Sequence, residues 1–411
     1  MRRTILLLVV VLAAVLVFSG CKSDDSPRLV YWSMWNEAEP QGQAIAAAAA
    51  AFTQETGIKV DINFNGREIR MTLQPALDGG VVIDIFDEDV DRVNSAWSNY
   101  LLNLDPFISR VYPTTGGRPY SQVVSQSLMA IARDAGGGSV RSIPYQPFVF
   151  SMMYNKDLFN QAGITVLPKT WAEFISVCER LQAAGIAPLT VDDAYAACFV
   201  GYVFDRVVGT EAALNMVAAK NFSNPGVLRA AQVLEQVAKY FHPNAAGNVW
   251  PAGQVNEFAG GRAAMYLNGT WLPNEIRGQV PNFNWGSFAF PAIDPAGRGI
   301  ESNNVGSQSY GINRNTKYPE EAFQFVVWMT TGRWDEELAR QSLGIPMGIN
   351  SQWPRQLAEA KAVVDVTTNR LPWAVGFQDD ADINATVTAN FQRLVAGTMN
   401  AAQFAEALRR L

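Results

Sequence analysis

The chain has 411 residues, of which 48% are hydrophobic and 17% are charged, a composition typical of a globular protein with a sizeable core. Its formal net charge is −6, and this mildly acidic balance argues against a nucleic-acid partner, which requires a basic face. The length accommodates two domains of ordinary size.

The first residues are typical of a secretory signal, because Arg2 and Arg3 precede the almost unbroken apolar run 5–18. This run is shorter than the ~20 apolar residues that a transmembrane helix needs. The small residues before Cys21 resemble a bacterial lipobox, so we expect residues 1–20 to be removed and Cys21 to be lipidated; an uncleaved anchor is the alternative. Loss of the two arginines leaves 32 − 2 = 30 basic against 38 acidic residues, or about −8.

A short polar segment, residues 21–27, has the composition of a linker between the predicted lipid and the folded chain. From residue 28 onward, segments typical of strands alternate with segments typical of helices. The strands are predicted at 28–33, 60–64 and 81–86, and the helices at 41–56 and 69–77. The third strand is solidly apolar, as in a parallel sheet that is covered on both faces. This order predicts an open α/β sheet.

Glycine and capping signals mark the middle of the chain. A hairpin turn and three strands are predicted there, the turn at 136–138 and the strands at 128–132, 140–143 and 148–154. Thr170 is followed three residues later by Glu173, which is the spacing of a capping box and predicts a helix to about residue 184.

Turn residues also mark later elements. Pro225 and Pro319 occupy the position that proline prefers at the start of a helix. The apolar run 263–267 predicts a strand, and it ends at Asn268–Gly269, the strongest short signal for a tight turn. The turn is followed almost at once by Trp271, so a large aromatic side chain is expected at the end of this strand.

Cysteine and histidine are too scarce to suggest a reactive centre. Cys178 and Cys198 either form a disulfide or remain two buried thiols, because the sequence does not fix the distance between them. The single histidine, His242, lies in a segment that resembles a helix end. No phosphate-binding loop, nucleophile elbow or metal-ligand cluster is present, so we predict no catalytic residue, no metal and no cofactor.

Polar and aromatic residues follow the first three predicted strands. Trp35, Asn36 and Glu37 come after the first strand, Arg67 after the second and Asp87 at the end of the third. Ligands of open α/β sheets bind at the carboxyl ends of the strands. Carboxylate, amide and guanidinium groups together accept and donate hydrogen bonds, which suits a ligand with many hydroxyls.

The chain has 11 tryptophans, and several lie next to turn residues rather than inside apolar runs. These are Trp35, Trp250, Trp271 and Trp373. A sugar ring has an apolar C–H face, so an exposed indole plate is a natural partner for it. Three other tryptophans sit in helical patterns and are predicted to pack the core, namely Trp171, Trp328 and Trp334.

Four segments together resemble the extracellular solute-binding lipoproteins of ATP-driven sugar importers, the family 1, maltose-binding-protein-like group. They are NGREIRMTLQPALDGGVVIDIFDED (65–89), MYNKDLFNQAGITVLPKTWAEF (153–174), FAGGRAAMYLNGTW (258–271) and SQSYGINRNTKYPEEAFQFVVWM (307–329). The resemblance implies a periplasmic-binding-protein-like type II fold, with two α/β lobes, a hinge and a ligand cleft between the lobes. It places residues 28–145 plus 303–357 in the N-terminal lobe and 146–302 plus 358–411 in the C-terminal lobe.

The resemblance also suggests site residues. In the family the tryptophan that closes the third segment commonly stacks on sugar, and here it is Trp271. The first segment commonly supplies polar contacts, of which Asp87 is the first candidate and Arg67 a weaker one. Further residues are predicted from position alone, namely Tyr145, Gln146, Asp193, Asn304 and Trp373.

These observations predict a carbohydrate receptor that is not an enzyme, is tethered to the cell membrane by lipid and delivers its ligand to the transmembrane subunits of an ABC permease. It is expected to act as a monomer and to close around the sugar by hinge bending. One alternative is a receptor for a polyamine or another small cation. A second is a surface glycoside hydrolase that uses a carboxylate pair such as Asp87 and Asp91 or Asp192 and Asp193. A third is a lipoprotein with this fold and no transport role.

Overall fold

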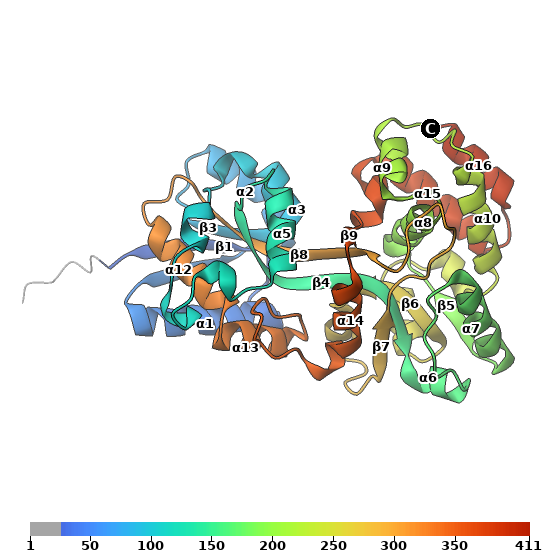
Figure 1. Cartoon of the computed structure of the whole chain (residues 1–411), viewed down its shortest axis with the longest axis horizontal. Helices are drawn as coiled ribbons and strands as arrows, with labels where there is room; N and C mark the ends of the chain where they lie inside the picture. The colour runs from blue at the N-terminus through green and yellow to red at the C-terminus, as the bar shows by residue number, and fades with distance from the viewer. Residues whose placement is uncertain (1–25) are drawn as a thin grey trace, which may run out of the picture.

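Two lobes lie side by side in the computed structural model, which describes residues 26–411 (Figure 1). The predicted signal peptide and Cys21 lie outside the described residues. Two long strands, β4 (Ser142–Asn155) and β8 (Ser302–Ile312), pass from one lobe to the other. Within the described part of the chain, no helix is long and apolar enough to cross a membrane.

One sheet of nine strands runs through both lobes, in the order β2-β1-β3-β8-β4-β6-β5, with β7 beside β4 and β9 beside β8. The other strands are β1 (Arg28–Ser33), β2 (Lys59–Phe64), β3 (Ile85–Asp89), β5 (Ala187–Thr190), β6 (Ala263–Gly269), β7 (Trp285–Phe288) and β9 (Asn369–Arg370). β1 is parallel to β2 and β3, whereas β8 is antiparallel to β3 and β4. The carboxyl ends of β1, β2 and β3 therefore meet at one edge of the first lobe.

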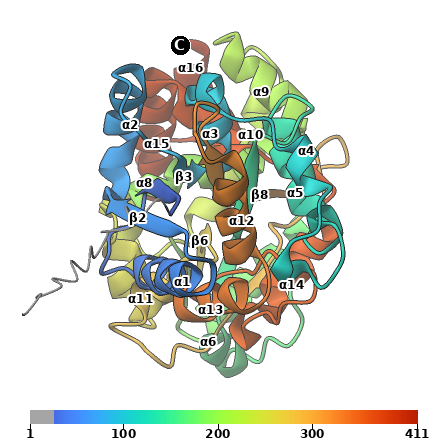
Figure 2. The same ribbon diagram turned by 90° about the vertical axis from the view of Figure 1, so that its left-hand side faces the viewer.

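Helices cover the sheet in both lobes (Figures 1 and 2). The first lobe holds α1 (Pro40–Thr56), α2 (Ile69–Asp78), α3 (Val90–Ala96), α4 (Asp105–Ile108), α5 (Gln126–Ala135), α12 (Pro319–Thr330) and α13 (Arg333–Ser342). The second lobe holds α6 (Lys156–Gln161), α7 (Trp171–Ala183), α8 (Asp193–Val208), α9 (Thr210–Ala218), α10 (Gly226–Ala238), α11 (Leu272–Ile276), α15 (Ala381–Val395) and α16 (Ala401–Arg409). α14 (Ala358–Val366) packs on β7 and β4 beside the crossing strands.

Short helical segments connect these elements, and the last of them is broken by left-handed residues at Ala374–Gly376. They are η1 (Gly66–Glu68), η2 (Ser98–Tyr100), η3 (Pro113–Thr115), η4 (Tyr120–Gln122), η5 (Pro243–Gly247), η7 (Arg355–Leu357) and η8 (Trp373–Asp379). The segment η6 (Gly253–Ala259) is a π-helix. π-helices are rare and occur frequently at functional sites.

Each lobe has its own hydrophobic core. The N-terminal lobe is defined by a cluster drawn from residues 29–145 and 310–347, and the C-terminal lobe by a cluster drawn from residues 150–290 and 371–408. β4 leaves the first cluster after Tyr145 and enters the second at Phe150. The residue-level lobe boundaries implied by the resemblance stay a prediction.

Most of the predicted elements are confirmed. β1 has its predicted bounds, α1 ends at Gly57 in the left-handed conformation, and Thr170 and Glu173 form the capping box of α7. Pro319 is the first residue of α12, whereas Pro225 caps α10 from the position before its first residue. Of the tryptophans assigned to cores, Trp171 and Trp334 are buried and Trp328 packs against the core of the N-terminal lobe.

Three local predictions are wrong. The third strand begins only at Ile85, because the preceding valines Val81 and Val82 are exposed in a loop. No hairpin surrounds Gly136–Gly138; instead α5 buries Leu128, Met129 and Ala132 on one face, and the glycines end it. The turn expected at Asn268–Gly269 also lies later, because both residues belong to β6.

The two cysteines of the described chain are free thiols. Cys178 lies in α7 and Cys198 in α8, and both are buried in the core of the C-terminal lobe. Burial raises the pKa of both thiols. They are therefore inert apolar groups, and the alternative of a disulfide is not realised.

Candidate functional site

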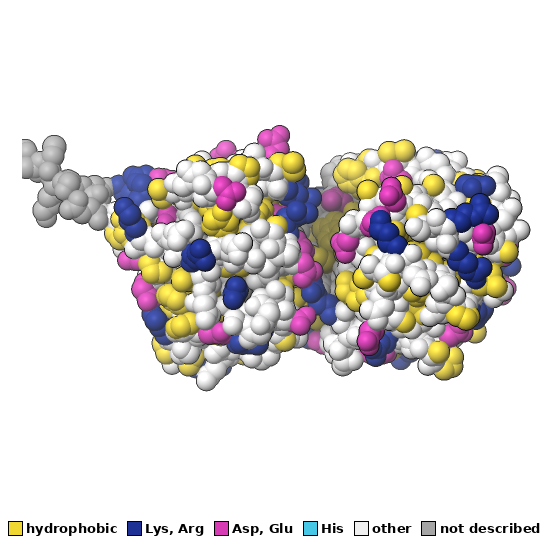
Figure 3. Space-filling view, turned by 90° about the horizontal axis from the view of Figure 1, so that it is seen from above, with side chains coloured by type: hydrophobic (Ala, Val, Ile, Leu, Met, Phe, Trp, Pro, Cys, Tyr) yellow, Lys and Arg dark blue, Asp and Glu magenta, His cyan; other side chains and the backbone are white. Residues whose placement is uncertain are grey.

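A hollow separates the two lobes on the molecular surface, and hydrophobic side chains lie in its depth (Figure 3). The N-terminal lobe contributes the loop after β1 to this junction. There Trp35 is only 7% exposed, and its indole N–H donates a hydrogen bond to Tyr145 Oη at 2.8 Å. The Arg67 guanidinium lies over its ring at 4.6 Å from the centroid. Trp35 is therefore covered by a cation rather than presented as a bare plate.

Arg67 is held in that position by two acceptors. Its Nη1 donates to the carbonyl oxygen of Met34 and to Glu39 Oε2, both at 2.8 Å. Gly66 next to it has a positive φ, and a Cβ there would lie 2.5 Å from Asn36 Oδ1. Glycine thus lets the loops after β1 and β2 touch. Asn36 and Glu37 form the exposed tip of this wall.

Asp87 is fully buried beneath the wall. Its Oδ1 accepts the backbone N–H of Met34 at 2.8 Å, and its Oδ2 accepts the hydroxyl of Tyr145. Burial raises the pKa of Asp87 to about 7, against these hydrogen bonds. Tyr145 is also buried and stacks on Tyr310 at 4.1 Å between centroids. The structure places Asp87 and Tyr145 behind Trp35, where they support the loop from within.

Trp271 lies at the opposite wall, in the C-terminal lobe, directly before α11. It is partly buried, and its ring meets Phe148 edge-on at 5.1 Å between centroids and approaches Trp373 at 6.1 Å. A Cβ at Gly269 would lie 2.1 Å from the Trp271 ring. The glycine of the Asn-Gly pair is therefore required by the packing of the indole against the strand end.

Glu275 follows Trp271 by four residues on α11 and faces the other lobe. Gln254 Nε2 donates to its Oε2 at 3.0 Å. The side chain is accessible, yet protein surrounds it on most sides, which raises its pKa to about 7. Arg67 opposes this rise and Glu39 adds to it, so these groups of the N-terminal lobe lie within electrostatic reach of Glu275. Glu275 and Arg67 thus lie on opposite sides of the junction and interact electrostatically across it.

The remaining predicted residues are spread along the junction. Asp193 Oδ1 accepts the backbone N–H of Trp250 at 2.9 Å, and Trp373 Nε1 donates to Gln378 Oε1 at 2.5 Å. Asn304 is buried, and its Nδ2 donates to the carbonyl oxygen of Leu371 at 2.8 Å, so it ties β8 to the chain before Trp373.

Gln146 lies where β4 crosses between the lobes. It has a φ of 43°, and the register of β4 against β8 shifts between Tyr145 and Pro147. Its side-chain Oε1 is buried and has no hydrogen-bond partner among the described residues. Gln146 is therefore a feature of the hinge strand.

The carboxylate pairs considered for a hydrolase are engaged in other contacts. Asp192 is buried and accepts hydrogen bonds from Gly253 N, Gln254 N and the Tyr266 hydroxyl. Asp91 of the N-terminal lobe accepts two hydrogen bonds from Arg370 of the C-terminal lobe. Nη1 donates to Oδ1 at 3.0 Å, and Nη2 donates to Oδ2 at 2.6 Å. Within residues 26–411, no group of His, Cys, Asp and Glu is arranged to hold a metal ion.

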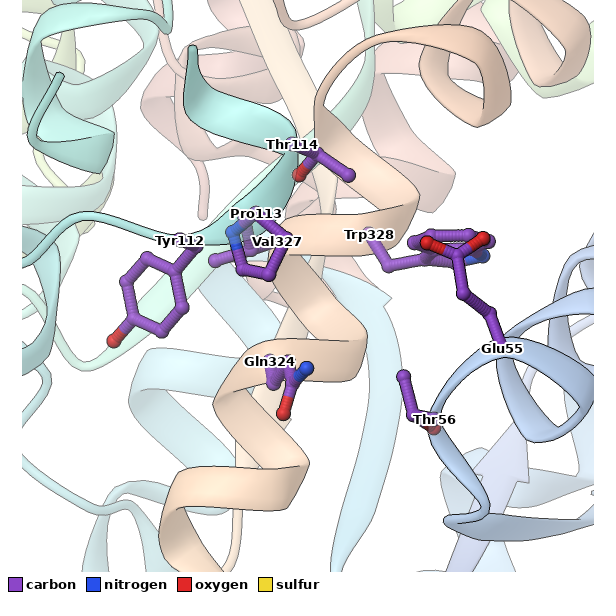
Figure 4. A pocket seen from close by; sticks show the side chains of 8 residues that line it. All are labelled: Glu55, Thr56, Tyr112, Pro113, Thr114, Gln324, Val327 and Trp328. Carbon is purple, nitrogen blue, oxygen red and sulfur yellow. The ribbon is translucent and has the colours of Figure 1, made fainter. Parts of the chain in front are cut away.

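Two partly open pockets lie away from these walls. One is a dent of about 20 Å³ between α1 and α12, lined by Glu55 and Trp328 among others (Figure 4), with room for about one water. The other, of about 170 Å³, lies beside the hinge and is lined by Pro147 and Val305. Phe148 contacts Trp271, and its neighbours in a strand point to the other face, so this second space lies behind the candidate cleft.

Sequence reasoning missed Glu275 and Gln254. Glu275 had a usable signal, because it follows Trp271 by one helical turn and therefore shares its face. Gln254 had none, because its role depends on the convergence of η6, β6 and α11.

A family model described as bacterial extracellular solute-binding protein matches residues 36–333 of the chain. Among curated proteins, the multiple sugar-binding protein of Streptococcus mutans is 31% identical over 206 residues, which are 47% of this chain and 48% of that protein. A putative binding protein of Brucella abortus is 25% identical over 226 residues, 51% of each chain. The chain thus aligns with about half the length of these relatives.

Solved structures share the fold over nearly the whole chain. A probable secreted solute-binding lipoprotein from Streptomyces coelicolor has a TM-score of 0.75 at 16% identity and covers 94% of this chain and 98% of its own. A chitin oligosaccharide binding protein has a TM-score of 0.70 at 20% identity, with coverage of 94% and 98%. The predicted type II fold of two α/β lobes with a hinge is thereby confirmed.

Proposed function

The chain belongs to the bacterial extracellular solute-binding proteins, and we propose that it is a receptor that binds a carbohydrate between its lobes and delivers it to an ABC permease. The observation that carries the proposal is the pairing of two unlike walls. Trp271 and Trp373 supply aromatic surface on one side, and Arg67 supplies a guanidinium on the other, within electrostatic reach of Glu275. An indole face suits the C–H face of a sugar, and the charged groups suit its hydroxyls.

The proposed cycle is hinge closure about the crossing strands. β4 and β8 pair across the boundary between the lobes, and the register shift beside Gln146 gives β4 a local irregularity there. A ligand that contacts both walls stabilises the closed form by its differential affinity for it. The permease then receives the closed form.

Tethering by lipid at Cys21, action as a monomer and the lack of catalysis belong to the same proposal. The similarity to the multiple sugar-binding protein supports a carbohydrate ligand for the matched half of the chain. The engagement of Asp91 by Arg370 and of Asp192 by backbone N–H groups supports binding without hydrolysis.

A thermal-shift panel of neutral mono- and oligosaccharides on residues 27–411 tests the proposal. A matching sugar at a hundred times its Kd stabilises the fold by ~2.7 kcal/mol and raises the melting temperature. A flat response across the panel contradicts it, and release of reducing ends from an oligosaccharide identifies a hydrolase instead.

A small organic cation is the second candidate, because Gln254 is the only side chain among residues 26–411 that donates a hydrogen bond to the Glu275 carboxylate. Glu275→Gln separates the two ligand classes. The variant abolishes binding of a cation such as spermidine, whereas a neutral sugar loses only one hydrogen bond to charge, a several-fold effect.

A further inference from the structure

Trp250 stands beside the candidate cleft, and 46% of its surface is exposed. Among residues 26–411, no other tryptophan or phenylalanine beside the cleft is as accessible. An exposed indole costs free energy in water, because its apolar faces stay hydrated. This one is nevertheless held firmly. Its backbone N–H donates to Asp193 Oδ1 at 2.9 Å, and its indole N–H donates to Gln254 Oε1 at 3.2 Å. The ring is thus both exposed and oriented.

The group that orients the ring is a buried amide. Gln254 is 2% exposed, and its Oε1 also accepts Asn268 Nδ2 at 3.4 Å while its Nε2 donates to Glu275 at 3.0 Å. One side chain therefore fixes the Trp250 indole with respect to the Glu275 carboxylate. No hydrogen bond of the described residues reaches Glu275 Oε1, so an acceptor stays available there.

The same network continues to the first aromatic plate. Asn268, whose Nδ2 donates to Gln254, lies in β6 three residues before Trp271. Trp250 and Trp271 therefore lie on one wall of the C-terminal lobe, connected through Gln254 and through Asn268 at the end of β6. The wall alternates an aromatic plate, a group of polar acceptors and a second aromatic plate.

We propose that Trp250 forms a second sugar-stacking subsite beside Trp271, so that the ligand is an oligosaccharide of at least two rings. This inference rests on the proposed carbohydrate function. Successive rings of an oligosaccharide present apolar C–H faces that are separated by hydroxyls and a glycosidic oxygen. This spacing of apolar and polar parts fits two plates with acceptors between them, whereas a single ring covers one plate only.

Isothermal titration calorimetry with matched series tests the proposal: galactose, melibiose and raffinose; glucose, maltose and maltotriose; N-acetylglucosamine and its β-1,4-linked dimer and trimer. The wild type is expected to bind the longer members of its matching series more tightly than the monosaccharide. Trp250→Ala lowers the affinity for these longer members by roughly tenfold and leaves the monosaccharide unchanged, so the preference for length disappears. Trp250→Phe keeps an aromatic plate and most of the affinity.

Val249→Ala is the matched control, because Val249 is the exposed neighbour of Trp250. This variant is expected to bind every sugar as tightly as the wild type does. The melting temperatures of all variants without ligand should stay close to the wild-type value. Equal affinity for one ring and several in the wild type overturns the second subsite, as does an unchanged length preference in Trp250→Ala. Both results leave the proposed function intact, whereas the absence of any sugar binding in the wild type overturns the proposed function itself.

Discussion

The two walls of the candidate cleft use tryptophan in opposite ways. In the N-terminal lobe, Trp35 donates a hydrogen bond to Tyr145 and is covered by the guanidinium of Arg67. Its ring surface is therefore buried in contacts within the protein. In the C-terminal lobe, Trp271 is only partly buried and Trp250 is 46% exposed. The first wall therefore presents a cation over its tryptophan, whereas the second presents aromatic surface beside the Glu275 carboxylate. A tryptophan after a strand end does not by itself indicate stacking, because the groups around it decide which face remains free.

Trp35→Ala should have the largest effect on the fold. The side chain is almost fully buried, so its loss removes packing under Arg67 and leaves the Tyr145 hydroxyl without its donor. We expect the free energy of unfolding to fall by about 3 kcal/mol or more. Urea denaturation measures this value. A fall in the free energy of unfolding of less than about 1 kcal/mol would show that Trp35 does not support the fold more than the tryptophans of the other wall do.

Trp271→Ala should weaken sugar binding and leave the stability of the fold nearly unchanged. We expect sugar affinity to fall roughly thirtyfold, equivalent to about 2 kcal/mol, while the melting temperature changes little. Calorimetry with the best sugar of the panel measures the loss. Trp328→Phe is the control, because Trp328 packs in the N-terminal lobe away from the cleft. Retained affinity in Trp271→Ala would assign this residue to the core.

Asp87→Asn probes the support of the N-terminal wall through pH. The pKa of Asp87 is raised to about 7, so its contribution to stability is complete below the unfolded value near 4 and is lost as pH rises through 7. We expect the variant to remove roughly 1–2 kcal/mol of the fall in stability between pH 5 and 8. Asp335 has a pKa of about 6, so its contribution to stability also falls as pH rises. Because Asp335 is present in both proteins, its contribution cancels in the comparison. Identical pH profiles of the two proteins would contradict the assignment.

Glu275→Gln should have the smallest effect and one that depends on pH. The carboxylate accepts ligand hydroxyls better than the acid does, so wild-type affinity should rise as pH increases through about 7, the pKa of Glu275. We expect a loss of about fivefold in the variant at pH 8 and little loss at pH 6. Glu55→Gln, beside α12, is the control with an unchanged profile (Figure 4). Equal losses at both pH values would exclude a titrating role.

Much of the fold was predictable because its signals are local. The capping box of Thr170 and Glu173 and the glycine that ends α1 act within a few residues of themselves. The errors arose where local patterns were ambiguous. Leu128, Met129 and Ala132 fit a short apolar strand as well as one face of a helix, and only packing of α5 on β4 and α3 selects the helix.

The candidate site was predictable in part for the same reason. Trp271 follows a strand end in the sequence, so its location needed no knowledge of the fold. The burial of Asp87 was not predictable, because the loop after β1 and the strand β4 cover it and come from distant parts of the chain. Gln254 gained its role from two partners, Asn268 and Glu275, that lie on other elements.

The sequence by itself determined the alternation of strands and helices, the family resemblance and the tryptophans that stand next to turns. These features depend on periodicity, capping and residue type, which act over short stretches of chain. The tertiary structure decided which tryptophan is covered by Arg67, which carboxylates are buried and which face the other lobe. Those outcomes depend on the order of strands in one sheet that runs through both lobes, and hence on contacts between residues far apart in the chain.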